Sequence, residues 1–93
     1  MKLHELKAWP EPFFAVVVGA KCFEIRRDDR GFEVGDVVNL REYVPPNSHL
    51  PGSPGAYTGR EQSVLITYLE RSECIPEGWC GFGFVRIGKR GGP

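Results

Sequence analysis

A lysine, a glutamate and an arginine stand close together in one short stretch of this chain, residues 19–26, which reads Gly-Ala-Lys-Cys-Phe-Glu-Ile-Arg. In an extended strand Glu24 and Arg26 share one face, while the apolar residues beside them point to the other. Lys21 falls in the turn that leads into this strand, so alternation does not fix its direction. A cluster of this kind can bind an anion or the edge of a nucleic-acid base, or it can take part in proton transfer.

The same spacing has a plainer interpretation. A Glu and an Arg two residues apart on a strand are commonly a solvated pair, which adds less than about 1 kcal/mol to the free energy of unfolding. If the pair of Lys21 and Glu24 is buried, it can instead be a structural ion pair that holds the strand to the preceding helix. The sequence leaves these alternatives open beside the functional one.

Length and composition indicate one small domain. The chain has 93 residues, of which 41% are hydrophobic, and twelve glycines and eight prolines predict short elements with sharp turns. We expect a single domain over residues 1–88 and a flexible basic tail over residues 89–93. The formal net charge of zero argues against strong nonspecific binding of long duplex DNA, but it leaves room for a pocket that takes one base or a short single strand.

The cysteines and the chain's hydropathy predict a cytoplasmic protein without a metal. Cys22, Cys74 and Cys80 are odd in number and form no C-x-x-C pair, so we expect three free thiols, no metal and no other cofactor. The N-terminal residues lack the apolar segment of a signal peptide. The longest apolar run, residues 13–18, is too short to span a bilayer, so we expect no membrane association.

The N-terminal third predicts a short strand over residues 3–8 and then the main helix near residues 10–18. Proline is tolerated in the first turn of a helix, so the helix begins at Pro10 or Pro12. Gly19 stands where a helix often ends. The run from Phe13 to Val18 is apolar on nearly every side, which predicts burial on most sides or a partner protein that covers the outer face.

The rest of the chain alternates in the manner of strands. Strands are predicted over residues 37–43, 62–69 and 79–87. A loop rich in proline and glycine, residues 44–55, separates the first two. In the second strand Tyr68 shares a face with Val64 and Ile66. Together with the many glycines and prolines, these features favour a mostly β fold, a small barrel or sandwich, over a helical bundle.

Six short motifs follow one another along the chain: His4-Glu-Leu-Lys7, Trp9-Pro10, Gly19-x-Lys21-x-Phe23-Glu24-Ile25-Arg26, Phe32-x-Val34-Gly35-Asp36, Leu40-Arg-Glu-Tyr43 and Tyr57-Thr-Gly59. Together they resemble the ASCH superfamily, and more narrowly a small uncharacterised branch of bacterial and phage proteins within it. The resemblance extends from about residue 2 to residue 87. It implies an α+β, mostly β fold, a PUA-like β-barrel of five or six strands with one or two short helices. It also implies a cleft between the first helix and the barrel that is floored by the Gly-x-Lys motif.

The resemblance also implies two activities. ASCH domains are generally proposed to bind RNA, and some small members are amidohydrolases that act on acetylated cytidine through Lys, Thr and Glu. Lys21 matches the lysine of these hydrolases, but Glu24 stands where they have threonine, so it would have to act as a base for water. Glu70 and Glu73 are candidates for the family's late glutamate by position only. Whether the chain is an enzyme therefore stays open.

These residues define an expected ligand site. We expect Lys21, Glu24 and Arg26 to line one cleft, Arg41 to contact phosphate or a base edge, and Trp9 and Tyr68 to stack on a base near the mouth. RNA or a nucleotide is then the expected partner. The alternatives are a hydrolase of acylated nucleosides, with Lys21 and Glu24 as catalytic residues, and a protein-interaction module that uses the helix at residues 13–18.

Overall fold

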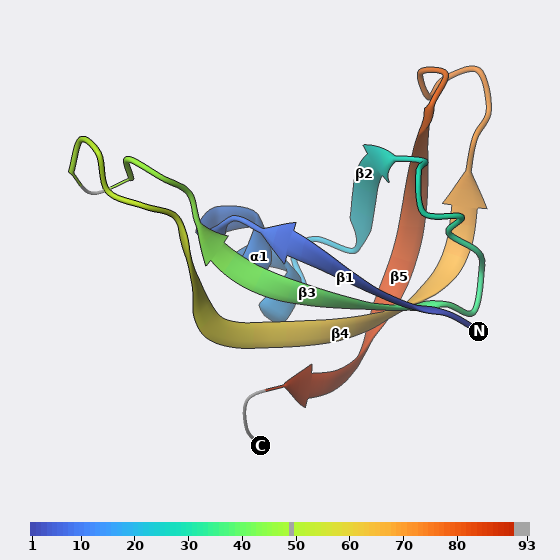
Figure 1. Ribbon diagram of the computed structural model, residues 1–93. Coiled ribbons are helices and arrows are strands. Elements are labelled where there is room, and N and C mark those ends of the chain that lie inside the picture. Colours follow the sequence, from blue (N-terminus) through green and yellow to red (C-terminus); the bar gives the residue numbers. More distant parts are fainter. Residues whose placement is uncertain (49, 91–93) are drawn as a thin grey trace.

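One curled, half-barrel sheet and one short helix make up the fold in the computed structural model, which describes residues 1–48 and 50–90. The elements follow in the order β1 (Leu3–Ala8), α1 (Pro10–Val17), β2 (Phe23–Arg27), β3 (Val37–Val44), β4 (Ala56–Glu70) and β5 (Trp79–Arg90). The expected α+β, mostly β architecture with five strands is therefore confirmed (Figure 1).

The sheet has the strand order β1-β3-β4-β5-β2, so β1 and β2 are its two edges. β1 pairs with β3 in parallel, and the remaining pairs are antiparallel. β3, β4 and β5 follow one another as a meander, and the loop that joins β3 to β4 extends away from the sheet (Figure 1). Because the sheet curls, the two edge strands approach each other beside α1.

The helix begins and ends where the sequence predicts. Trp9 is extended, and its carbonyl accepts the first helical hydrogen bond, from the Phe13 amide at 2.9 Å. Gly19 has φ +85°, the left-handed conformation that ends many helices. An arginine of β5, Arg86, donates to the carbonyl of Val17 and so fixes the end of α1 against the sheet.

Only one face of α1 is buried. Phe13 and Val16 enter the core, whereas Phe14 and Val18 remain more than half exposed. The apolar run from Phe13 to Val18 is therefore not covered on most sides by its own chain. A protein partner on the outer face of α1 stays a prediction.

The core lies on the concave side of the sheet. It consists of Leu6, Ala8, Phe13, Val16, Phe32, Val38, Leu40, Val64, Ile66, Cys80, Phe82 and Phe84. β1 shows the alternation expected of a half-buried strand, with every second residue inward. Burial on this scale is the main favourable term for folding.

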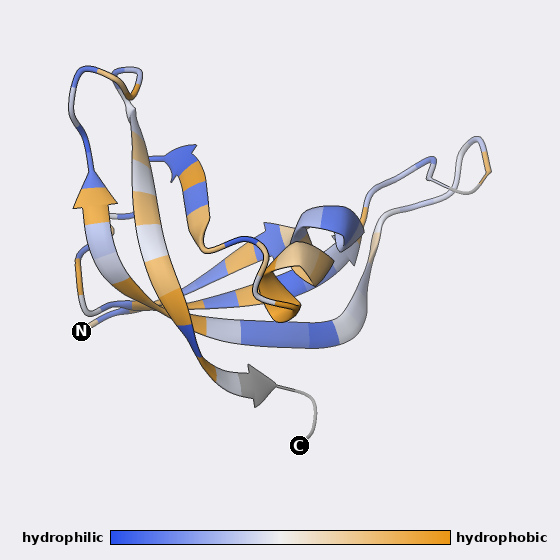
Figure 2. Ribbon diagram, turned by 180° about the vertical axis from the view of Figure 1, so that it is seen from behind, coloured by the Kyte–Doolittle hydropathy of each residue, from blue (hydrophilic) through white to orange (hydrophobic). Residues whose placement is uncertain are grey.

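β2 points Glu24 and Arg26 inward and its apolar residues outward. Glu24 is buried, while Phe23 and Ile25 on the opposite face are more than half exposed, and bands of alternating hydropathy cross the strand in Figure 2. Hydrophobicity alone would favour the reverse orientation. The inner side of β2 is not part of the closed core, because it forms the wall of a hollow in which Glu24 meets two cations.

Two strands run further than the sequence predicts. β4 begins at Ala56 rather than near residue 62, and β5 continues to Arg90 rather than ending at residue 87. The expected basic tail therefore starts within β5, and residues 91–93 lie outside the described residues.

A register shift between Ile66 and Tyr68 interrupts the pairing of β4 with β5. Such a bulge turns the side chains beyond it to the opposite face. Ile66 is buried and Leu69 packs against the core, whereas Tyr68 faces outward. Within the described residues, no helix is long and apolar enough to cross a membrane.

Candidate functional site

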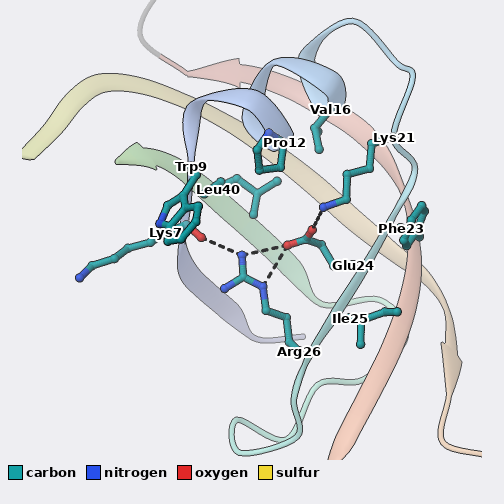
Figure 3. A pocket seen from close by; sticks show the side chains of 11 residues that line it. Lys7, Trp9, Pro12, Val16, Lys21, Phe23, Glu24, Ile25, Arg26 and Leu40 are labelled. Atoms are coloured by element: carbon teal, nitrogen blue, oxygen red, sulfur yellow. Dashed lines mark hydrogen bonds and ion pairs between the residues drawn. The ribbon is translucent and has the colours of Figure 1, made fainter. Parts of the chain in front are cut away.

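A hollow of about 380 Å³ lies between α1 and the two edge strands. We call it the α1–β2 pocket, and it is lined by Lys7, Ala8, Trp9, Pro12, Val16, Lys21, Phe23, Glu24, Ile25, Arg26 and Leu40 (Figure 3). β1 and the start of α1 supply one wall, β2 the other, and β3 part of the floor. The structure thus brings together four of the residues that the sequence singles out: Trp9, Lys21, Glu24 and Arg26.

Glu24 is the centre of the pocket's charge. Its side chain is 7% exposed and contacts two cations. Lys21 Nζ pairs with Oε1, and Oε2 accepts from Arg26 Nε at 3.0 Å and pairs with Arg26 Nη2 at 2.9 Å. The solvated-pair interpretation is therefore wrong for Glu24, because a carboxylate this deeply buried needs such partners.

The hydrogen-bonding capacity of the cluster is not exhausted. An ionised carboxylate offers roughly four acceptor positions and an ammonium group three donors. Three donors from Lys21 and Arg26 reach Glu24, which leaves one acceptor position on the Oε1 side. Lys21 Nζ uses one of its hydrogens there, so a free donor and a free acceptor stand next to each other.

Arg26 also joins the two edges of the sheet. Its Nη2 donates to the carbonyl of Lys7 in β1 at 2.7 Å, and Arg30 Nη1 donates to the carbonyl of Glu5 at 3.1 Å. Carbonyls on the outer side of an edge strand have no ladder partner. The two arginines therefore replace backbone pairing across the gap between β1 and β2, and Arg26 has both a structural and a site contact.

Trp9 stands at the mouth of the pocket, at the junction of β1 and α1, and lines the pocket together with Lys7 and Arg26 (Figure 3). The ring is largely exposed. The walls below it are apolar, since Pro12, Val16 and Leu40 line this part. An exposed aromatic ring above an apolar floor is a surface on which a planar ligand can stack.

The other two predicted residues lie outside this pocket. Arg41 is on the outer face of β3, where its guanidinium carbon lies 3.9 Å from the centroid of the Tyr57 ring. Tyr68 is an outward residue of β4, and its hydroxyl donates to Glu70 Oε1 at 3.3 Å. The placement of Tyr68 at the mouth is thus corrected, because the bulge in β4 turns it away. Glu70 and Glu73 do not line the pocket either.

Sequence reasoning missed the role of Lys7, which contributes its carbonyl to Arg26. No side-chain pattern signals a backbone acceptor, because it depends on which strands become edges. The residues that the structure describes contain no group of three His, Cys, Asp or Glu side chains that could hold a metal ion. Cys22 and Cys74 are exposed free thiols, and Cys80 is a buried one whose pKa is raised by burial.

Comparison with known proteins gives one family and one curated relative. Residues 3–84 match the family described as "Domain of unknown function (DUF3850)". The chain is also similar to an "Uncharacterized 12.9 kDa protein in GpA 3'region" of Escherichia phage P2, with 36% identity over 66 residues. That alignment covers 71% of this chain and 52% of the relative, so the chain spans about half the length of the phage protein.

Proposed function

The chain belongs to the family described as a domain of unknown function (DUF3850), and from that premise we propose that it binds the base of a nucleotide or of a single-stranded RNA in the α1–β2 pocket. One observation carries the proposal. The buried Glu24 presents a free acceptor beside the free donors of Lys21, at the bottom of a pocket whose mouth holds an exposed tryptophan.

The chemistry of the pocket suits a base edge. Each base carries an N–H group next to a carbonyl oxygen or a ring nitrogen that accepts, and the Glu24–Lys21 pair offers the complementary acceptor and donor. Trp9 would stack on the face of the same base, a contact of about 1–3 kcal/mol. The zero net charge supports recognition of one or a few nucleotides rather than a long duplex.

We further propose that this family is a branch of the ASCH superfamily, with a PUA-like fold. The five-stranded curled sheet and the position of the pocket beside the first helix support this relationship. A solved ASCH domain that superposes with the same strand order would strengthen it. A different strand order in those domains would count against it.

Thermal denaturation with added nucleosides, nucleoside monophosphates and short single-stranded RNAs tests the binding proposal. A ligand bound only by the folded protein adds about 2.7 kcal/mol at a hundredfold excess over its Kd. Lys21→Ala should remove this ligand-induced shift, and it should also lower the unliganded melting temperature, because the buried Glu24 loses one of its two cationic partners. Lys2→Ala is the matched control, because Lys2 is exposed and lies outside the pocket. Equal binding by both variants would refute the proposal.

A second candidate function rests on the direct contact between Lys21 and Glu24. In this alternative Glu24 removes a proton from water, the water attacks the acyl carbonyl of an acylated nucleoside, and the amide C–N bond breaks while the amine takes up a proton. Glu24→Gln distinguishes the two functions. A hydrolase should lose turnover by about 10²–10⁴-fold and still bind, whereas a binding module should show no turnover in either form.

A further inference from the structure

A second hollow, of about 340 Å³, is lined by Arg26 but not by Glu24. We call it the basic hollow, and its lining includes Glu5, Lys7, Arg26, Arg30, Arg41 and Tyr57. Among these described lining residues, four carry positive charge and one carries negative charge. Lys7 and Arg26 also line the α1–β2 pocket, so the two hollows meet at these residues.

Arg41 of the basic hollow is held in place by an aromatic ring and not by a hydrogen-bonded ion pair. Arg41 stacks on Tyr57 with 3.9 Å from guanidinium carbon to ring centroid, and its nitrogens lie 3.9 Å from Glu5 and Glu61 oxygens. At that separation neither pair is a hydrogen bond. The guanidinium of Arg41 is thus oriented by the ring, and the nearest carboxylate oxygens of Glu5 and Glu61 leave its N–H groups able to turn to a ligand.

Arg26 and Arg30 face the same hollow with donors to spare. Arg26 commits Nε and Nη2 to Glu24 and the Lys7 carbonyl, while its Nη1 points away from Glu24 and carries no dashed line in Figure 3. Arg30 donates to the Glu5 carbonyl through Nη1, and its Nε lies 3.9 Å from Asp29 Oδ1, too far for a hydrogen bond. Guanidinium groups with free N–H donors match the geometry of phosphate oxygens.

We propose that the basic hollow binds a phosphate group of the ligand whose base lies in the α1–β2 pocket, so that the substrate class is a nucleotide unit and not a nucleoside. This inference rests on the proposed base-binding function. A ligand that spans the two hollows would cross Arg26, with its base on the Glu24 side and its phosphate on the Nη1 side. The phosphate can be that of a free nucleotide or of a short RNA.

The carboxylates near the basic hollow limit the number of phosphate groups that it can bind. Glu5 lines it, and Glu61 lies beside Arg41. A row of phosphates along this surface would be repelled by these negative charges. A single phosphate could bind between Arg30 and Arg41 without contacting either carboxylate. The site is therefore suited to a single phosphate in a fixed position next to the base.

Calorimetric titration of four ribonucleosides, their 5′-monophosphates, inorganic phosphate and a dinucleotide tests the inference. The monophosphate of the preferred base should bind about 10–100-fold more tightly than its nucleoside, as charge-assisted hydrogen bonds imply. That advantage should shrink at high salt, while nucleoside binding stays constant. Tighter binding of the dinucleotide than of the monophosphate would assign the phosphate to RNA, and the opposite order to a free nucleotide.

The variant that carries Arg30→Gln and Arg41→Gln should bind the monophosphate only as tightly as the nucleoside. Arg27→Gln is the matched control, because Arg27 is an exposed arginine of β2 that lines neither hollow, and it should keep the full advantage. If nucleosides bind through Lys21 but the phosphate adds no affinity in the wild type, the phosphate inference fails alone. If no nucleoside or nucleotide binds, both proposals fail.

Discussion

Two carboxylates of this protein are buried to nearly the same extent and have opposite surroundings. Glu24 is 5% exposed and Asp36 is 1% exposed. Asp36 accepts from the backbone amides of Lys2 at 2.9 Å and Glu33 at 3.0 Å, and its Oδ2 lies 2.9 Å from His4 Nε2. The partners of Glu24 are instead the ends of two long side chains that line a hollow.

The difference shows that burial of a charged group does not by itself mark a ligand site. The amides that hold Asp36 are fixed by the turn before β3 and by β1, so they cannot exchange it for a ligand. The ammonium and guanidinium groups that hold Glu24 can rotate toward an incoming base without disturbing the backbone. Asp36 is therefore assigned to stability and Glu24 to binding, and each of the following predictions tests this assignment.

Replacement of Asp36 should have the largest effect on stability. Asp36→Ala leaves two backbone N–H groups and His4 without their acceptor, so we expect a loss of about 2–4 kcal/mol in the free energy of unfolding. Urea denaturation measures it. Asp29→Ala, at an exposed carboxylate, should change the value by less than about 0.5 kcal/mol. Similar losses in the two variants would show that the Asp36 cluster is not structural.

Replacement of Trp9 should have the largest effect on binding. Trp9→Ala should weaken the base ligand by about 1–3 kcal/mol, the contribution of one stacked base. Tyr68→Ala is a matched control, since Tyr68 is 62% exposed and Trp9 60%, and both changes should leave the melting temperature nearly unaltered. Loss of affinity in the Tyr68 variant instead would move the ligand from the α1–β2 pocket to the outer face of β4.

Arg26→Lys should show that the Glu24 cluster also has a structural part. A lysine keeps the charge but cannot reach Glu24 and the Lys7 carbonyl through a rigid fork, so we expect a loss of about 1–2 kcal/mol in unfolding free energy. Arg27→Lys on the outer face should have almost no effect. An unchanged stability in the Arg26 variant would mean that the contact between β1 and β2 is not needed to hold the two edges together.

The smallest expected effect is on the free energy of unfolding at acid pH. Burial raises the pKa of Asp36, but the hydrogen bonds from His4 and from the amides of Lys2 and Glu33 outweigh it and lower the pKa below its usual 3.8. A carboxyl whose pKa is lower in the folded state stabilises the protein above its unfolded pKa and loses this contribution as the pH falls through the folded value. Asp36 should therefore add no pH dependence above about pH 5, and its contribution should be lost progressively below that pH.

Denaturation curves at several acid pH values check this prediction. Between neutral pH and about pH 5, wild type and Asp36→Asn should show parallel changes in stability. Below about pH 5 the stability of the wild type should fall more steeply. Asp28 and Glu42 also have lowered pKa values, because Arg71 hydrogen-bonds the first, and hydrogen bonds from Arg60 and Thr58 outweigh the burial of the second. Some acid sensitivity should thus persist in the variant, and equal slopes below about pH 5 would contradict the assignment.

Local sequence signals predicted much of the fold and four of the residues that line the α1–β2 pocket. Pro10 and Gly19 mark the two ends of α1 because their backbone preferences act locally. The period of two along a strand placed Glu24 and Arg26 on one face, as the structure shows. Lys21 joined them because the turn after α1 is short.

Features that depend on pairing between distant strands could not be predicted from the local sequence. The bulge between Ile66 and Tyr68 arises from pairing with β5, and it reversed the expected direction of Tyr68. The Lys7 carbonyl meets Arg26 only because β1 and β2 are opposite edges of one curled sheet. The inward direction of Glu24, against the hydrophobic preference of β2, has the same cause.

The strand order also determines how late in synthesis some strands can pair. β2 is complete at residue 27, yet its partner is the segment Trp79–Gly83 of the last strand. During synthesis β2 must wait for most of the chain, and pairing over such separations is slow. Every residue that lines the α1–β2 pocket lies before residue 41, but a chain that stops at residue 78 should neither bind the base nor melt cooperatively. Binding and melting curves of that truncated chain can be compared directly with those of the full-length protein.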